Sequence, residues 1–134
     1  ECLRKLPMNS MKELSLSIEA YDYNYPPYCI EMTGAEAIDI QTMGNLWRLK
    51  FDRFSFEANE LEVIVSNQSI SHLTLKMCRF KECINLITNF SGLKYLNLKY
   101  VEEVDNNFLI RLVENCKELN SHSDTSIPYS FLLI

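Results

Sequence analysis

The chain has 134 residues, of which 47% are hydrophobic, and its formal net charge is −5 at pH 7. This length fits one domain, and the apolar fraction is large enough to build a core. The negative charge argues against binding of nucleic acid or of an anionic membrane through bulk charge. No apolar run approaches the roughly 20 residues of a membrane span.

The chain begins Glu-Cys-Leu-Arg-Lys-Leu-Pro, which has neither an initiator methionine nor the charged-then-apolar layout of a signal peptide. The segment from Cys2 to Leu6 is typical of the end of a repeat helix. We therefore expect residues 1–134 to form a single domain that is a piece of a longer chain.

An apolar pattern of the form Leu-x-x-Leu-x-Leu recurs four times. Its central leucines are Leu14, Leu49, Leu73 and Leu96, so successive patterns are 35, 24 and 23 residues apart. The last two spacings lie in the window of about 20–29 residues that is typical of leucine-rich repeats. Alternation of apolar and polar residues predicts a half-buried strand in each pattern. The expected strands lie near residues 11–16 and over 47–51, 71–76 and 95–99.

The first spacing is too long by roughly ten residues, which indicates an insertion at about residues 19–35. The insertion carries Pro26-Pro27, which stops both a helix and a strand ladder. It also holds four of the seven tyrosines in the chain, Tyr21, Tyr23, Tyr25 and Tyr28. Two interpretations remain open, because an exposed aromatic loop can contact a partner and can equally fold back over the first repeat.

An amphipathic segment follows each of the last three strands. Apolar residues three and four positions apart predict helices near 58–65, over 82–90 and over 107–116. Asp105 or Asn106 is the expected N-cap of the last helix. The residues expected on the inward faces are Leu61, Ile64, Val65, Cys83, Leu86, Ile87, Phe90, Phe108, Leu109, Leu112, Val113 and Cys116.

Parallel strands joined by helices give an α/β fold. A unit of this kind cannot bury its apolar face alone, so neighbouring units must stack on it. We therefore expect a leucine-rich-repeat solenoid of about four repeats, with short parallel strands on the concave face and helices on the convex face.

The five cysteines are an odd number at irregular spacings, without a Cys-x-x-Cys pair and with only two histidines in the chain. This pattern predicts no metal site and favours reduced, buried thiols over a disulfide framework. We expect a cytoplasmic or nuclear location, or both. Two glycosylation triplets, at Asn67 and Asn89, would argue for a secreted protein if they carried glycans.

The fourth repeat resembles the cysteine-containing leucine-rich repeat of F-box proteins. That repeat continues from the leucine pattern into a turn with a capping aspartate and a helix that ends Asn-Cys-x-x-Leu. The matching residues are Leu93, Leu96, Leu98, Val104, Asp105, Leu109, Leu112, Asn115, Cys116 and Leu119. Tyr100 departs from the pattern, because a cysteine or asparagine usually ends the strand, and Cys78 and Asp52 occupy the corresponding stretch in other repeats.

The resemblance implies the substrate-recruiting part of a ubiquitin ligase subunit. In that family a separate F-box contacts the ligase scaffold, and no F-box pattern is present in this sequence. The resemblance covers the recognition part alone and carries over no catalytic residue.

The outward residues of the strands form the candidate binding surface. Residues from adjacent repeats line up in columns about 5 Å apart. The residues expected to contact a partner are Arg48, Lys50, His72, Thr74, Lys76, Tyr95, Asn97 and Lys99. This strip leans basic on an acidic protein and would suit an acidic or phosphorylated protein segment, with Tyr95 as an aromatic anchor. Lysines on a solvated strand face are the alternative interpretation.

Catalytic patterns are weak in this sequence. It has three scattered glycines and no phosphate-binding loop, and nothing orients His72 and Cys78 as a nucleophile pair. We expect no enzymatic activity and no cofactor. Three functions remain: a substrate-recruiting domain of an F-box-type ubiquitin ligase, a scaffold or complex subunit unrelated to ubiquitin, and a secreted recognition module.

Overall fold

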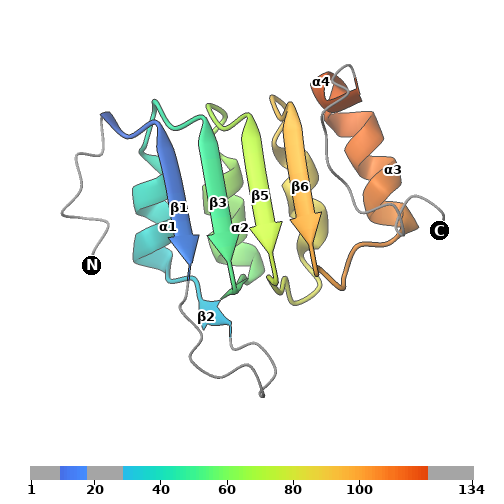
Figure 1. Cartoon of the computed structure of the whole chain (residues 1–134), viewed down its shortest axis with the longest axis horizontal. Coiled ribbons are helices and arrows are strands. Elements are labelled where there is room, and N and C mark those ends of the chain that lie inside the picture. The colour runs from blue at the N-terminus through green and yellow to red at the C-terminus, as the bar shows by residue number, and fades with distance from the viewer. Residues whose placement is uncertain (1–9, 18–28, 121–134) are drawn as a thin grey trace.

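The computed structural model describes residues 10–17 and 29–120. Its centre is a parallel sheet with the strand order β1-β3-β5-β6 (Figure 1). A second, two-stranded parallel sheet joins β2 to β4 below the first. The strands are β1 (Glu13–Ser17), β2 (Ile30–Glu31), β3 (Arg48–Asp52), β4 (Phe54–Ser55), β5 (His72–Lys76) and β6 (Tyr95–Lys99). The chain is thus a mixed α/β protein.

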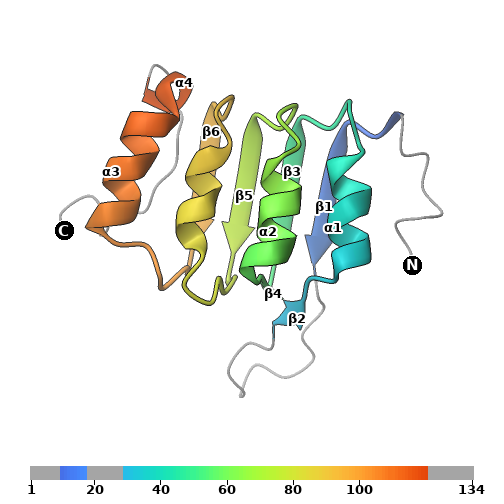
Figure 2. The same ribbon diagram turned by 180° about the vertical axis from the view of Figure 1, so that it is seen from behind.

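The helices cover one face of the four-stranded sheet, as the view from behind shows (Figure 2). Two of them, α1 (Gly34–Gln41) and α2 (Ala58–Val65), pack side by side, and the 3-10 helix η3 (Ile84–Asn89) continues the layer. Beyond β6 lie α3 (Asn106–Asn115) and the short α4 (Lys117–Asn120). None of the helices in the described ranges is long and apolar enough to cross a lipid bilayer.

The four long strands pair without any slip in register. Leu14 lies opposite Leu49, Leu49 opposite Leu73, and Leu73 opposite Leu96. Such exact pairing follows from the sequence, because each strand alternates apolar and polar residues and a shift by one would turn the leucines to solvent. The four expected strands are therefore confirmed to within two residues at each end.

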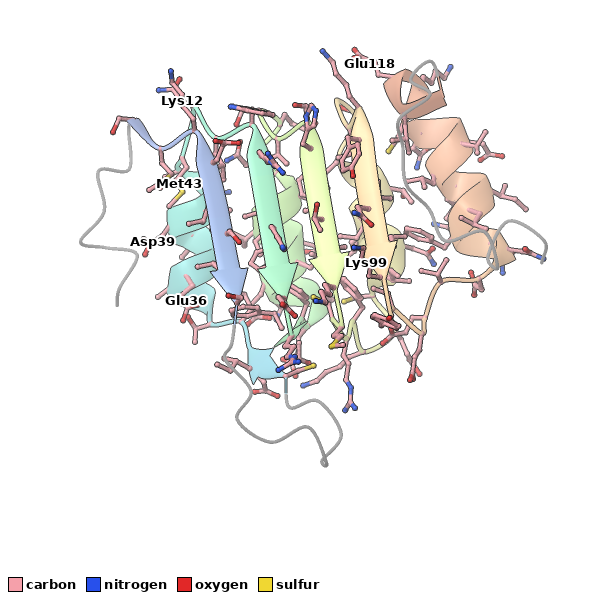
Figure 3. All side chains as sticks on the ribbon, in the orientation of Figure 1. Lys12, Glu36, Asp39, Met43, Lys99 and Glu118 are labelled. Atoms are coloured by element: carbon pink, nitrogen blue, oxygen red, sulfur yellow. The ribbon has the colours of Figure 1, made fainter. Side chains whose placement is uncertain are left out.

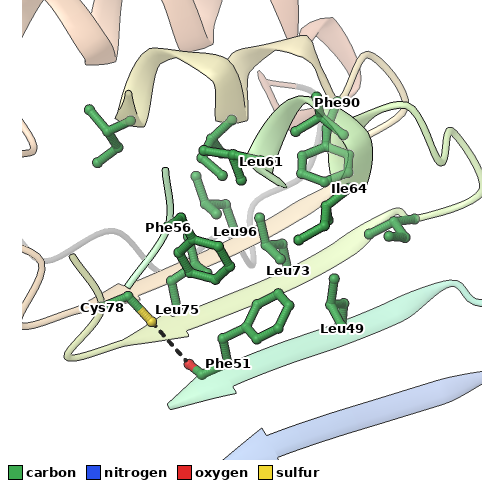
Figure 4. Close-up of a cluster of buried hydrophobic side chains, with 14 of the residues drawn as sticks. Leu49, Phe51, Phe56, Leu61, Ile64, Leu73, Leu75, Cys78, Phe90 and Leu96 are labelled. Atoms are coloured by element: carbon green, nitrogen blue, oxygen red, sulfur yellow. Dashed lines mark hydrogen bonds between the residues drawn. The ribbon is translucent and has the colours of Figure 1, made fainter. Parts of the chain in front are cut away.

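The core lies between this sheet and the helices (Figure 4). Leu73 and Leu96 are each 1% exposed or less, and Leu61 and Ile64 of α2 lie above them. Aromatic rings fill part of the core. Phe51 contacts both Phe54 and Phe56, and Phe56 stacks on Phe80 with ring centroids 5.2 Å apart. The inward positions expected from the leucine patterns are thus buried in β3, β5 and β6, while Leu16 of β1 is only half-buried.

The helix expected over 82–90 is shorter and tighter than predicted. Lys81 and Glu82 have positive φ angles, so regular helix begins only at Ile84, and the segment to Asn89 is a 3-10 helix. A 3-10 helix rises about 2.0 Å per residue against about 1.5 Å in an α-helix. Six residues of η3 therefore span about the same 12 Å as the eight residues of α1 or α2. The segment between β5 and β6 can thus cover the same length of sheet with fewer residues.

The last long helix begins where the sequence predicts. The Phe108 N–H donates to Asp105 Oδ1 at 2.8 Å, which makes Asp105 the N-cap. Phe108 and Leu112 are buried against the stack, but Val113 is 56% exposed, so its expected inward position is wrong. The reason is geometric: each helical residue is rotated by about 100° from the one before, so Val113 turns away when Leu112 faces inward.

The residue after each long strand from β3 onward lies in the left-handed region. Arg53, Met77 and Tyr100 have φ angles of 68°, 53° and 55°. The chain reverses its side-chain direction there and buries the next residue, which is Phe54, Cys78 or Val101. Val101, and not Tyr100, therefore corresponds to Cys78, so the placement of Tyr100 at the strand-ending position is wrong by one residue.

The described cysteines are free thiols, and most of them pack in the core. Cys78, Cys83 and Cys116 are buried and Cys29 is half-buried. Their sulfurs donate to main-chain carbonyls of neighbouring units, as Cys78 does to the Phe51 oxygen at 3.6 Å (Figure 4). Burial raises the pKa of Cys78 to about 12 and that of Cys116 to about 11. These residues act as small apolar groups with weak donors.

We expect Cys29 to react with iodoacetamide before Cys78 and Cys116 in the native protein at pH 8. The thiolate is the reactive form, and a pKa of about 12 for Cys78 lowers its ionised fraction about a thousandfold relative to an unfolded thiol. Peptide mapping by mass spectrometry after timed alkylation measures each rate. In urea the three rates should converge, and equal rates in the native protein would contradict the burial described here.

Candidate functional site

The open face of the sheet is the candidate site. The helices that overlie the four strands all lie on the other side, and none of the described segments covers the face turned to the viewer in Figure 1. The pairing register places its side chains in three rows: Glu13, Arg48, His72 and Tyr95; then Ser15, Lys50, Thr74 and Asn97; then Ser17, Asp52, Lys76 and Lys99. All eight residues expected in the strip therefore share one surface, on which Figure 3 labels Lys99.

An aromatic row crosses the amino-terminal end of this face. We use that name for Trp47, His72 and Tyr95. The Trp47 ring meets the His72 ring edge-on with centroids 4.9 Å apart, and the His72 and Tyr95 rings stack at 5.7 Å. The Ser71 hydroxyl lies 2.9 Å from His72 Nδ1 and holds the imidazole in place. Trp47 remains 38% exposed, so the row offers a rigid apolar surface to a ligand.

The sequence alone leaves two roles open for Trp47, which are capping the core and binding a partner. Trp47 directly precedes β3, and its ring contact with His72 places the indole at the amino-terminal edge of the open face. The sequence predicts that His72 and Tyr95 are neighbours, because they occupy the same position in adjacent strands. The ring contact between Trp47 and His72 could not be predicted, because it depends on rotamers that the sequence does not specify.

A cluster of three lysines lies toward the carboxyl-terminal end of the same face. We call Lys50, Lys76 and Lys99 the lysine triad. Lys76 and Lys99 are direct register partners on β5 and β6, and Lys50 is on β3. Among the described residues, none of the three has a carboxylate within 4.0 Å. Like charges placed directly opposite each other destabilise a sheet, so the pairing of Lys76 with Lys99 does not add to the stability of this sheet.

The other charges on the face are already paired. Arg48 donates to Glu13 at 3.3 Å, and both side chains are more than half exposed, so a ligand carboxylate can displace Glu13 at little cost. Asp52 lies 3.9 Å from the Arg53 guanidinium, and its Oδ1 is buried. The structure therefore separates Arg48 from the lysine triad, although the sequence places all four in one basic strip.

Thr74 and Asn97 occupy the middle of the face. Both are half-buried, and Asn97 Nδ2 lies 3.4 Å from the Tyr95 hydroxyl, to which it donates. Thr74 and Asn97 lie in the same row as Lys50, between the aromatic row and the pair Lys76 and Lys99. The second candidate surface, formed by Tyr21, Tyr23, Tyr25 and Tyr28, lies outside the residues that the structure describes.

Other chemistry finds little support in this part of the chain. His72 faces the open side whereas Cys78 is buried on the other, so they form no nucleophile pair. Within residues 10–17 and 29–120, no group of three His, Cys, Asp or Glu side chains could hold a metal ion.

Comparisons with protein-family models, with curated proteins and with solved structures found no significant match. The assignment of a function therefore depends on the geometry of the open face and on the motif in the fourth unit.

Proposed function

We propose that this chain is a leucine-rich-repeat solenoid that binds another protein through the open face of its sheet. Three features support the solenoid. The four strands pair without a slip, the helices lie on one side, and equivalent buried positions recur at the end of each unit. The residues at that recurrent position are Met43, Asn67, Phe90 and Cys116.

The cysteine of the fourth unit supports the narrower proposal of an F-box-type repeat. Cys116 Sγ lies 3.5 Å from the Thr88 oxygen and 3.3 Å from the Phe90 oxygen, so it ties its helix to the preceding unit. The neighbouring Asn115 Nδ2 donates to Thr88 Oγ1 at 3.3 Å. These contacts give the Asn-Cys pair a structural reason, and the domain would recruit substrate for a ubiquitin ligase without catalysing a reaction itself.

The environment of the glycosylation triplet at Asn67 favours a ubiquitin ligase subunit or a scaffold subunit over a secreted recognition module. Asn67 is 5% exposed, and its Nδ2, the atom to which a glycan would be attached, donates to the Ile40 and Met43 oxygens at 2.8 and 3.0 Å. A glycan at this atom would require the first two units to separate. A scaffold subunit unrelated to ubiquitin remains the second candidate, because it would use the same face.

The observation that carries the binding proposal is that the lysine triad and the aromatic row share the open face. Lysines without carboxylate partners in the described chain face solvent on a protein of net charge −5. Charge complementarity selects an acidic or phosphorylated protein segment, and the aromatic row supplies the apolar contact that such sites need.

We expect the Lys50→Glu, Lys76→Glu, Lys99→Glu variant to fold normally and to lose its partner. Reversing three charges on the contact face should lower partner capture about tenfold or more. Affinity capture from cell extract with quantitative mass spectrometry measures this loss. The matched control reverses three exposed charges away from the face, at Arg79, Arg111 and Lys117.

The proteins recovered decide between the two candidates. Ligase scaffold proteins, together with a partner that the triad variant loses, would support a ubiquitin ligase subunit. A fixed complex without ligase components would support the scaffold. Equal capture by the wild type and the triad variant would contradict binding through the open face.

A further inference from the structure

We infer that the open face reads an extended acidic peptide in which an aromatic side chain and a carboxylate stand four residues apart, the first on the aromatic row and the second between Lys76 and Lys99. This inference rests on the proposed function and adds the geometry of the ligand to it.

The spacing follows from the strands themselves. His72 and Tyr95 begin β5 and β6, and Lys76 and Lys99 end the same strands, four residues later. At a rise of about 3.3 Å per residue this separates the two clusters by about 13 Å. An extended peptide that lies along the strands has the same rise, so residues four apart in the peptide span the same distance.

The direction of the peptide follows from where the two clusters lie. His72 and Tyr95 are neighbours at the start of β5 and β6, and Lys76 and Lys99 are neighbours at the end of these strands, where Figure 3 labels Lys99. A segment that crossed the strands would contact one cluster only. Between the ends, Thr74 and Asn97 are short and half-buried, so an extended backbone can pass over them.

Side-chain alternation sharpens the rule. In an extended chain, residues an even number of positions apart point to the same face. An aromatic residue and a carboxylate four apart therefore both point to the sheet, whereas a separation of three or five turns one of them away. This parity distinguishes the proposed mode from attraction by net charge, which would not depend on spacing at this scale.

The cationic groups favour carboxylates over a single phosphate. The triad supplies three separate ammonium groups on three strands, each a point charge, and such spread charges match several separate carboxylates better than one compact group. Lys50, one strand away in the middle row, can meet a second carboxylate. We therefore expect two acidic residues in the preferred ligand.

The test uses fluorescent peptides of identical composition, each with one phenylalanine and two glutamates. The separation between the phenylalanine and the first glutamate is varied from two to eight residues. Fluorescence anisotropy with the whole chain gives a dissociation constant for each peptide. We expect the peptide with a separation of four to bind about tenfold more tightly than those with three or five.

Two variants connect the peptide to the two clusters. Lys76→Gln with Lys99→Gln should abolish the preference for a separation of four between phenylalanine and glutamate. Trp47→Ala should raise the dissociation constant of every peptide in the series, because each contains phenylalanine. Thermal unfolding of each variant confirms that it is folded.

Affinities that do not depend on spacing, or no binding by any peptide of the series, would overturn the inference. A single-stranded oligonucleotide that binds more tightly than every peptide would also overturn it, since aromatic and lysine side chains together suit such ligands. If protein capture still depends on the lysine triad, only the peptide geometry fails. If that dependence is lost as well, the proposed function fails with it.

Discussion

Replacement of Leu96 by aspartate is expected to unfold the domain. Leu96 is 0% exposed on β6, where it lies opposite Leu73 and faces the core beneath the helices. Burying a carboxylate there without a partner costs several kcal/mol, as does keeping it protonated at neutral pH. Loss of the leucine packing adds about 2–5 kcal/mol. The sum is comparable to the whole stability of a domain of this size, about 5–15 kcal/mol.

Circular dichroism during a urea titration measures the effect. The matched control is Lys99→Asp, which introduces the same residue on the same strand at an exposed position. We expect the control to change stability by no more than about 0.5 kcal/mol. A Leu96→Asp variant with the midpoint of the wild type would contradict the register of the sheet.

The strands and their register could be predicted because two independent patterns agree. Alternation fixes which side of each strand is buried, and the regular spacing of Leu49, Leu73 and Leu96 fixes how the strands align. Helix α2 was equally predictable, since Leu61, Ile64 and Val65 form one apolar face and are all buried. Local pattern and tertiary packing favour the same structure at these positions.

The segments that sequence reasoning missed are those where packing overrides the pattern. Ile84 to Asn89 carries helical spacing but forms a 3-10 helix, because two residues before it adopt positive φ and the unit must still match its neighbours in length. Val113 lies within a helical apolar pattern, yet the orientation of α3 is set by Phe108 and Leu112. The spacing of apolar residues predicts that a helix has an apolar face, but it does not determine which of two adjacent apolar residues is buried.

The residues that form the candidate site could be predicted from the sequence, but the ion pairs between their side chains could not. The columns place Lys50, Lys76 and Lys99 on one face. They do not show that Arg48 is bound to Glu13 while the triad has no carboxylate nearby in the described chain. That distinction depends on side-chain conformations, and it sets the three lysines apart from Arg48.

Asn67 is the polar link between the first two units. Its amide donates to the Ile40 and Met43 oxygens, and its Oδ1 accepts from the Ser69 N–H at 3.1 Å and the Ser69 hydroxyl at 2.6 Å. Every hydrogen-bonding group of the Asn67 side chain therefore has a partner, although the residue is as buried as a core leucine. Such a fully satisfied buried amide is intolerant of changes that reverse a donor.

Asn67→Asp is accordingly expected to destabilise the domain by about 3 kcal/mol or more at pH 7. The substitution keeps the shape but places a carboxylate oxygen where Nδ2 lies 2.8 Å from the Ile40 oxygen and 3.0 Å from the Met43 oxygen. Repulsion between these oxygens raises the pKa of the new carboxyl in the folded state. The penalty should therefore be smallest below the unfolded pKa of about 4, and should grow as the pH rises above it.

Asn89→Asp is the matched control, because Asn89 belongs to the second glycosylation triplet and its side chain is exposed. Urea titrations of both variants at pH 4 and pH 7 separate the local effect from the general influence of acid on the protein. We expect Asn89→Asp to stay within about 0.5 kcal/mol of the wild type at both pH values. Equal stability of the two variants at pH 7 would mean that the Asn67 amide does not bridge the units. Met43, Asn67, Phe90 and Cys116 occupy the same position in successive units. Packing alone would then hold the first two units together at this position, whereas Cys116 would still contact the preceding unit through its sulfur.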